Sequence, residues 1–390
     1  MVYDFDQVVD RRNTQSQKWD NMIRMGNKDA IPMWIADMDF PCPQPVIDAV
    51  MARARHPIYA YPKVDDSFYS VTARWIKRRY GWEIDPSWAV LTVGITPIYN
   101  NLIIALTEPG DKIIIQPPVY QCFPEAVINN GREISANMLC YQDGKYTMDF
   151  EDLQKRAADP KAKIMILSSP HNPVGRVWTK DELLQVAKIC YENNVLLISD
   201  EIHGDFMLFG HEHIPTASLN ETYAKNIVTC YAPTKTFNIA GIRCAAIIIP
   251  DEKLRALLNK QLRAVRANEL SIFAQPAYIA AYTLCDDYIE QLRKYLEESV
   301  EYVDSFFKKH MPKIKLVRPE STYLLWFDCS ELGMTSKELE EFFIQKAAVG
   351  VMISDYFGVK GIPFMRMNIA CSRVTLKQAL EQLLEAYNKL

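Results

Sequence analysis

The sequence has no apolar run near the ~18 residues that a membrane-spanning helix requires. Residues 1–6 are acidic and lack the apolar core of a signal peptide, so we expect no such peptide. No cluster of lysine and arginine stands out, and the formal net charge is -4, which argues against a nucleic-acid partner. Repeats and low-complexity tracts are also absent. We therefore expect a cytoplasmic protein that binds neither a membrane nor a nucleic acid.

Several site-forming motifs are missing as well. The nine cysteines are scattered, and no two have the C-x-x-C spacing of a zinc or redox site, which is typical of a reducing compartment. His211, Glu212 and His213 have no third or fourth metal ligand nearby, so we predict no metal site. There is no Gly-x-Ser-x-Gly, Walker or Gly-x-Gly-x-x-Gly motif. Serine hydrolases, nucleoside triphosphatases and dinucleotide-binding enzymes therefore lack their signatures here.

What the sequence does contain is a regular alternation of short apolar strands and helices. Its 390 residues are too many for one small core, so we expect two domains. Apolar runs of four to six residues between helices indicate an α/β fold with a mostly parallel sheet, covered on both faces. Such sheets bind ligands beyond the carboxyl ends of their strands. The predicted strands are 89–93, 112–115, 163–168, 195–199, 227–231 and 244–249.

The two ends of the chain have different patterns. Helices dominate from 251 to 310, and short strands and helices alternate after that, which indicates a small α+β module. The first residues are irregular and rich in proline near 32–45. We predict an N-terminal arm at 1–45 that belongs with the small domain, a large domain at 46–286 and a small α+β domain at 287–390.

Lys235 lies between two apolar strands, with hydroxyl groups at Thr234 and Thr236 and a cation at Arg243. An amine, hydroxyls and a fixed cation suit a phosphorylated aldehyde cofactor. The amine would form a Schiff base, and the hydroxyls and the guanidinium would hold the phosphate. An ordinary surface turn explains this stretch equally well when it is considered alone.

Other polar residues also follow predicted strands. A buried Asp200 would hold a pyridine nitrogen protonated, although it could instead cap a helix. His203 could orient Asp200 or reach the same ring. The Pro-x-Asn-Pro loop could present the Asn172 amide to a phenolic oxygen, or it could be a plain turn. Tyr120 could stack on a planar cofactor, or it could be a core or surface tyrosine.

Two further features suit anions. Ile95 and Thr96 lie in a turn at a predicted helix N-terminus, where backbone N–H groups cradle anions. Arg366, at the start of an apolar strand, needs a carboxylate from a substrate or from a structural ion pair. The extended stretch 32–41, with Trp34 and two aspartates, could cover a pocket or serve as a packed connector.

Taken in order, these residues resemble the fold-type I pyridoxal-phosphate enzymes of the aminotransferase class I/II superfamily over essentially the whole chain. Within that group, the sequence is most similar to the MalY/PatB-type cystathionine β-lyases, which are carbon–sulfur lyases. The stretches that carry this resemblance are 33–40, 199–203, 210–219 and 234–241. The resemblance implies a large domain with a mostly parallel seven-stranded sheet between helices. It also implies a smaller α+β domain, pyridoxal 5′-phosphate as cofactor and a homodimer with shared active sites.

The resemblance also implies a role for each matching residue. Lys235 would bond covalently to the cofactor as the catalytic residue. The cofactor ring would be contacted by Asp200, Asn172, Tyr120 and His203. The cofactor phosphate would be bound by Ile95, Thr96, Thr234 and Arg243, and by Tyr61 of the neighbouring subunit. The substrate carboxylate would be bound by Arg366 with help from the backbone around Ala36, and Trp34 would also contact the substrate.

Two departures from the wider superfamily affect the functional prediction. Position 232 is alanine where many relatives carry serine, so one phosphate contact is missing. Position 203 is histidine where aminotransferases usually have tyrosine, which favours a lyase. The resemblance implies α,β-elimination of L-cystathionine, related cysteine S-conjugates, cystine or cysteine to a thiol, pyruvate and ammonia. An aminotransferase, and a regulator that uses this fold to bind a protein, remain as alternatives.

Overall fold

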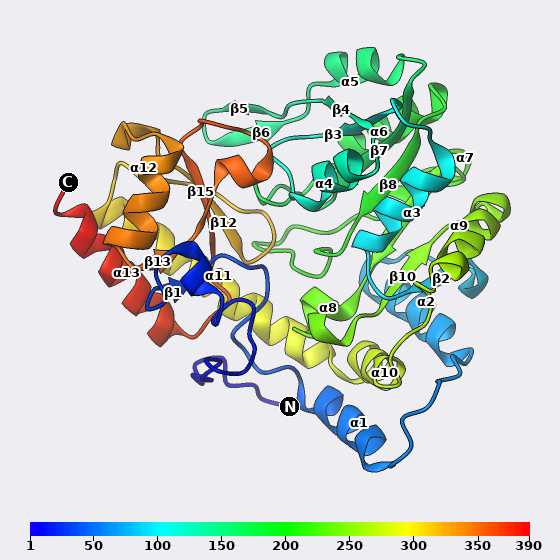
Figure 1. Cartoon of the computed structure of the whole chain (residues 1–390), viewed down its shortest axis with the longest axis horizontal. Helices are drawn as coiled ribbons and strands as arrows, with labels where there is room; N and C mark the ends of the chain where they lie inside the picture. Colours follow the sequence, from blue (N-terminus) through cyan, green and yellow to red (C-terminus); the bar gives the residue numbers. More distant parts are fainter.

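The computed structural model describes residues 1–390 and is built around a central seven-stranded sheet (Figure 1). In spatial order the strands are β2 (Ala89–Thr92), β10 (Ala245–Ile248), β9 (Ile227–Tyr231), β8 (Leu196–Asp200), β7 (Ala162–Ser168), β3 (Lys112–Ile115) and β4 (Glu133–Ala136). Only β10 runs antiparallel to its neighbours. The predicted α/β fold with a mostly parallel sheet is therefore confirmed.

Helices cover both faces of this sheet, which explains why its strands read as continuous apolar runs. Along β3, Ile113 and Ile115 belong to one apolar cluster, and Ile114 belongs to the other. The first cluster includes residues of α3 (Thr96–Leu106), α4 (Cys122–Asn129) and α9 (Glu252–Ala264). The second includes residues of α2 (Ser67–Tyr80), α5 (Phe150–Ala157), α6 (Lys180–Glu192) and α10 (Ala274–Leu284).

The C-terminal part forms a second, antiparallel sheet. Its four strands, in spatial order, are β11 (Lys315–Val317), β12 (Leu324–Asp328), β15 (Phe364–Asn368) and β14 (Met352–Ile353). The helices of this part are α12 (Ser336–Glu341) and α13 (Arg373–Tyr387), and α13 contacts the long α11 (Asp286–His310). The division into domains at 46 and 287 stays a prediction. In the sequence, all strands of the central sheet precede residue 287, and all strands of the C-terminal sheet follow it.

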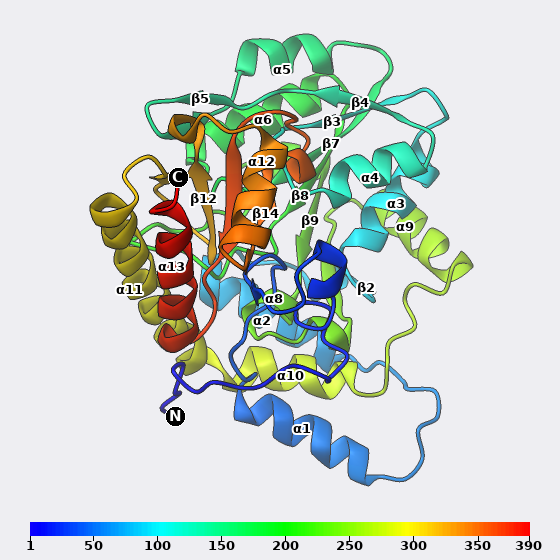
Figure 2. The ribbon, with the colours of Figure 1, turned by 60° about the vertical axis from the view of Figure 1, so that its left-hand side comes forward.

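The start of the chain joins the C-terminal part to the central sheet. β1 (Ile31–Pro32) pairs in parallel with β13 (Val349–Gly350), and α1 (Gln44–Arg55) packs on α10. In Figure 2 the dark blue N-terminal segment passes close to α8 (Pro233–Thr236). The remaining β-strands and α-helices are β5 (Cys140–Gln142), β6 (Lys145–Thr147) and α7 (Glu221–Ala224), and short 3₁₀-helices lie in several of the loops. No helix is both long and apolar enough to cross a membrane.

The structure corrects three details of the predicted elements. Lys235 lies on the short helix α8 rather than in a simple turn. Arg366 is the central residue of β15, not its first. The sequence pattern also predicts one helix at 337–347, whereas the structure has α12 followed by a π-helix at Phe342–Lys346. The edge strand β4 was not predicted, because it is half exposed and mixes polar with apolar residues.

Candidate active site

A cavity of about 250 Å³ opens at the carboxyl ends of the central strands. Its walls come from the turn after β2, the loops after β3 and β7, the end of β8 and the helix after β9. This is where a ligand is expected in a parallel sheet. Ten predicted site residues line it: Ala36, Ile95, Thr96, Tyr120, Asn172, Asp200, His203, Thr234, Lys235 and Arg243.

Lys235 presents its amine to this cavity. The Nζ atom donates a hydrogen bond to the Ala36 carbonyl oxygen at 2.5 Å. Burial lowers the pKa of the Lys235 amine, and the charge of Arg366 lowers it further, against the opposite effects of Asp37 and Asp200. A lowered pKa increases the fraction of neutral amine, which is the form that acts as a nucleophile and as a base.

Asp200 is the last residue of β8 and is 7% exposed. Its Oδ2 atom accepts a hydrogen bond from the Tyr99 hydroxyl at 2.5 Å, and its Oδ1 atom accepts one from the Ile202 N–H at 3.2 Å. Burial raises the pKa of Asp200 to about 6. No cationic side chain forms an ion pair with this carboxylate. Asp200 is therefore a buried acid that a positively charged ligand atom would stabilise.

Tyr99 was not predicted as a site residue. It lies on α3, three residues after Thr96, and is 1% exposed. Residues three apart lie on the same face of a helix. The spacing between Thr96, in the predicted anion-binding turn, and Tyr99 therefore indicated that Tyr99 would face the same cavity. Ser168, Ile202 and Ala240 also line the cavity without having been predicted.

His203 lines the cavity and makes no hydrogen bond to Asp200, and its predicted contact with the cofactor ring stays a prediction. Tyr99 and the Ile202 N–H take up the hydrogen bonds to Asp200 instead. Burial, together with the charges of Lys235 and Arg366, lowers the pKa of His203 to about 3. The imidazole is therefore neutral at ordinary pH, and its buried Nδ1 atom has no hydrogen-bond partner.

Arg366 is a buried cation without a carboxylate partner. Its Nη1 atom donates to Asn172 Oδ1 at 3.0 Å, and its Nη2 atom donates to the Trp34 carbonyl at 2.7 Å. The Nε atom has no partner, and burial lowers the pKa of Arg366 to about 10. A structural ion pair is thus excluded, and a ligand carboxylate would satisfy the guanidinium.

Three predicted residues lie outside the cavity lining, namely Arg366, Trp34 and Tyr61. The Trp34 indole turns away, and its Nε1 atom donates to the Lys18 carbonyl at 3.0 Å. Only the Trp34 backbone contacts Arg366. Tyr61 is 95% exposed in the single chain. Its predicted contact needs a second subunit and stays a prediction.

The end of the cavity near α3 suits a phosphate. Ile95 and Thr96 begin the helix, where backbone N–H groups have no partner within the helix. Thr234 adds a hydroxyl, and the exposed Arg243 adds a cation. Ala232, where a serine hydroxyl was expected in relatives, is buried and contributes no polar atom.

These groups together fit pyridoxal 5′-phosphate. The cavity offers an anion-binding end, the Lys235 amine for an aldehyde and the acid Asp200 for a protonated ring nitrogen. Each of these groups lacks a full set of partners within the chain, which is the condition that a bound ligand relieves.

Comparison with known proteins agrees with this geometry. Residues 28–383 match the model of aminotransferase class I and II. The chain belongs to this family. Cystathionine beta-lyase PatB of Bacillus subtilis is 39% identical, over 97% of this chain and 98% of PatB.

Comparison with solved structures also places the chain among pyridoxal-phosphate proteins. Cystalysin of Treponema denticola, which contains a pyridoxal 5′-phosphate cofactor, is 34% identical with a TM-score of 0.96 over the whole of both chains. A pyridoxal-phosphate-bound protein of Clostridium difficile 630, provisionally called an aminotransferase, is 41% identical. Its TM-score is 0.97, over 99% of this chain and 100% of that protein. Within the family, the chain thus groups with the cystathionine β-lyases.

Proposed function

We propose that the protein is a pyridoxal-phosphate-dependent carbon–sulfur β-lyase. It eliminates a thiol from L-cystathionine, or from a related cysteine S-conjugate, cystine or cysteine, and releases pyruvate and ammonia. The observation that carries this proposal is the unpaired Arg366 guanidinium held beside the same cavity as the Lys235 amine and the Asp200 carboxylate. The likeness to PatB and to cystalysin supports the lyase over other reactions of the family.

Different residues of the chain act in different steps of the reaction. Pyridoxal phosphate, when bound, supplies an electron-withdrawing ring that stabilises negative charge at the substrate Cα. Arg366 binds the substrate carboxylate and fixes its orientation. The Lys235 amine, whose pKa is lowered, accepts the proton from Cα. The bond from Cβ to sulfur then breaks, and its electron pair leaves with the thiolate. The aminoacrylate that remains is hydrolysed by water to pyruvate and ammonia.

The surrounding residues hold the cofactor. Asp200 keeps a proton at the ring nitrogen, and Asn172, Tyr120 and His203 contact the ring. The phosphate is bound by Ile95, Thr96, Thr234 and Arg243, all of which line one cavity. Tyr61 completes the phosphate site of a second subunit, which makes the protein a homodimer. Its exposure in the single chain supports this role. The protein acts in the cytoplasm.

Replacement of Lys235 by alanine tests the proposal. We expect Lys235→Ala to abolish pyruvate release and the visible absorbance of the lysine-bound cofactor, because no other amine replaces Nζ. Lys225→Ala removes an exposed lysine at the end of α7 and serves as the matched control. Full lyase activity in Lys235→Ala would overturn the proposal. Failure of the wild-type protein to bind pyridoxal phosphate would favour the protein-binding alternative.

An aminotransferase is the second candidate function, because the Clostridium difficile structure with the same fold is provisionally called one. Fold alone does not separate the two reactions. A panel of cystathionine, cystine, cysteine and other thioethers separates them. Pyruvate released without an added keto acid indicates the lyase, and amino transfer that depends on a keto acid indicates the aminotransferase.

A further inference from the structure

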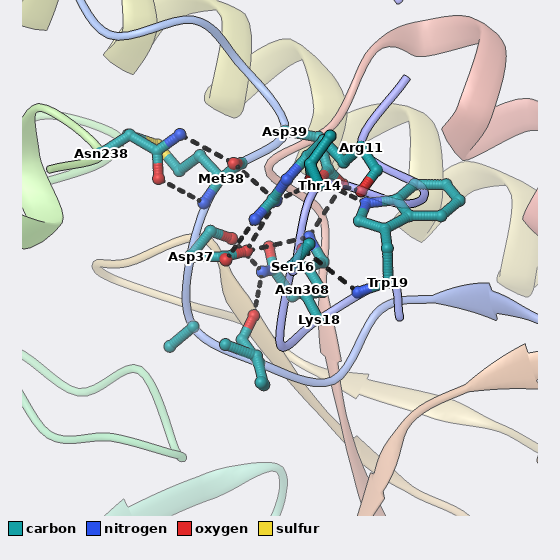
Figure 3. Close-up of polar contacts among 12 residues, drawn as sticks. Arg11, Thr14, Ser16, Lys18, Trp19, Asp37, Met38, Asp39, Asn238 and Asn368 are labelled. Carbon is teal, nitrogen blue, oxygen red and sulfur yellow. Dashed lines mark hydrogen bonds and ion pairs between the residues drawn. The ribbon is translucent and has the colours of Figure 1, made fainter. Parts of the chain in front are cut away.

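Residues 33–40, which we call the arm segment, contact two charged groups of the active site, Lys235 and Arg366. The Ala36 carbonyl accepts from the Lys235 amine at 2.5 Å, and the Trp34 carbonyl accepts from Arg366 at 2.7 Å. A displacement of this segment would therefore disturb both the base and the carboxylate-binding group. Its position is determined by contacts on two sides (Figure 3).

On one side, the arm segment is fixed by ion pairs and by the C-terminal sheet. Arg11 pairs with Asp37 at 2.7 Å and with Asp39 at 2.6 Å, and the 1% exposed Lys18 pairs with Asp39 at 2.8 Å. Asn368 on β15 donates to the carbonyls of Ile35 and Asp37 at 2.5 and 2.6 Å. These contacts hold the segment without any help from α8.

On the other side, the Asn238 side chain joins residues 38–40 of the arm segment to the end of α8, which we call the lysine helix. Asn238 lies three residues after Lys235 and points toward Met38 in Figure 3. Its Oδ1 atom accepts from the Met38 N–H at 3.0 Å, and its Nδ2 atom donates to the carbonyls of Met38 and Phe40, each at 2.8 Å. Asn238 has a φ of 55°, a left-handed conformation that asparagine tolerates better than most residues.

We propose that Asn238 is a positioning residue, which holds the arm segment at a fixed place relative to Lys235 and thereby aligns Arg366 with the substrate carboxylate. This inference rests on the proposed lyase function for its kinetic consequence. Its structural part, the fastening of residues 38–40 to the lysine helix, is independent of the reaction. Asn238 is not proposed to touch substrate or cofactor.

Asn238→Gly tests the proposal, because glycine accepts the left-handed φ and removes only the three hydrogen bonds. Asn194→Gly is the matched control. Asn194 has a φ of 56°, is exposed and makes no side-chain hydrogen bond. We expect Asn238→Gly to raise KM about tenfold, which corresponds to the loss of one or two hydrogen bonds, and to change kcat less. The absorbance of the bound cofactor should not change.

Hydrogen exchange of two adjacent amides gives a readout that does not depend on activity. The Met38 N–H is protected by Asn238, whereas the Asp39 N–H donates to the Ala370 carbonyl at 2.8 Å. In the holoenzyme, Asn238→Gly should speed exchange at Met38 about tenfold and leave Asp39 nearly unchanged. Equal acceleration of both amides, or a KM within twofold of the Asn194→Gly control, would overturn the proposal.

A second variant covers the case in which Asn238→Gly does not fold. Asn238→Asp keeps the acceptor for the Met38 N–H and loses the donor to the two carbonyls. We expect Met38 to stay protected while KM rises, and an unchanged KM would overturn the proposal. If the wild-type protein releases no pyruvate from any substrate, the lyase function fails. The exchange rates of Met38 and Asp39 then still decide whether Asn238 fastens the arm segment.

Discussion

Removal of the Tyr99 hydroxyl is expected to raise the pKa of Asp200. The two groups share a 2.5 Å hydrogen bond in a site where Tyr99 is 1% and Asp200 is 7% exposed. A hydrogen bond to an ionised acceptor is worth about 1.5–3 kcal/mol, and 1.36 kcal/mol corresponds to one pKa unit. Tyr99→Phe should therefore raise the pKa of Asp200 from about 6 to about 7–8.

The sign of the effect follows from which form of Asp200 the ligand needs. The pKa of Asp200 already lies above the ordinary 3.8 of an aspartate. Ionisation of Asp200 therefore lowers the stability of the free protein progressively as pH rises from about 4 to 6. A cationic ring nitrogen requires the ionised form, so affinity for pyridoxal phosphate falls as pH drops through the pKa of Asp200. In Tyr99→Phe this fall should begin at higher pH.

The assay is titration of the cofactor-free protein with pyridoxal phosphate at a series of pH values. Tyr141→Phe is a matched control, because the exposed Tyr141 hydroxyl donates to Asp328 at 3.2 Å, away from the cavity. The ionisation of the cofactor itself affects the wild type and both variants equally. The test is therefore the difference between the pH profile of each variant and that of the wild type. A pH profile for Tyr99→Phe that coincides with wild type, or that moves to lower pH, would refute the reasoning.

Two further predictions concern the site, and a third concerns a buried pair outside the cavity lining. Arg366→Lys keeps the charge but loses the planar fork, so KM should rise about 10- to 100-fold while cofactor absorbance stays unchanged. An unchanged KM would remove Arg366 from substrate binding. Arg243→Met should weaken pyridoxal-phosphate affinity about tenfold in a direct titration, because a cation near the phosphate is lost. Equal affinity would show that the phosphate does not bind there. His213→Ala removes one of the hydrogen bonds to the 1% exposed Glu201, which keeps those from Ser199, Thr216 and Tyr231, so urea unfolding should show a loss of about 1.5–3 kcal/mol. A loss below about 1 kcal/mol would contradict this.

The sequence by itself determined six of the seven strands of the central sheet and the location of the site. Buried parallel strands have to be apolar throughout, so their limits could be read to within about one residue. The carboxyl ends of parallel strands meet at one edge, so Asp200 and Lys235, which follow separate strands, were expected close together. Both do line one cavity. The cofactor and the reaction were predicted from the family resemblance, because the spacing of apolar residues carries no information about either.

Tertiary structure alone decided which groups are paired and which remain free. Tyr99, not His203, binds Asp200, because the packing of α3 against the sheet places its hydroxyl there. Arg366 has no carboxylate partner, although the sequence allowed a structural ion pair. Trp34 contributes its carbonyl to the site while its indole turns away. Side-chain direction depends on contacts between distant segments, such as that between Trp34 and Arg366, which are 332 residues apart, and local sequence patterns do not encode such contacts.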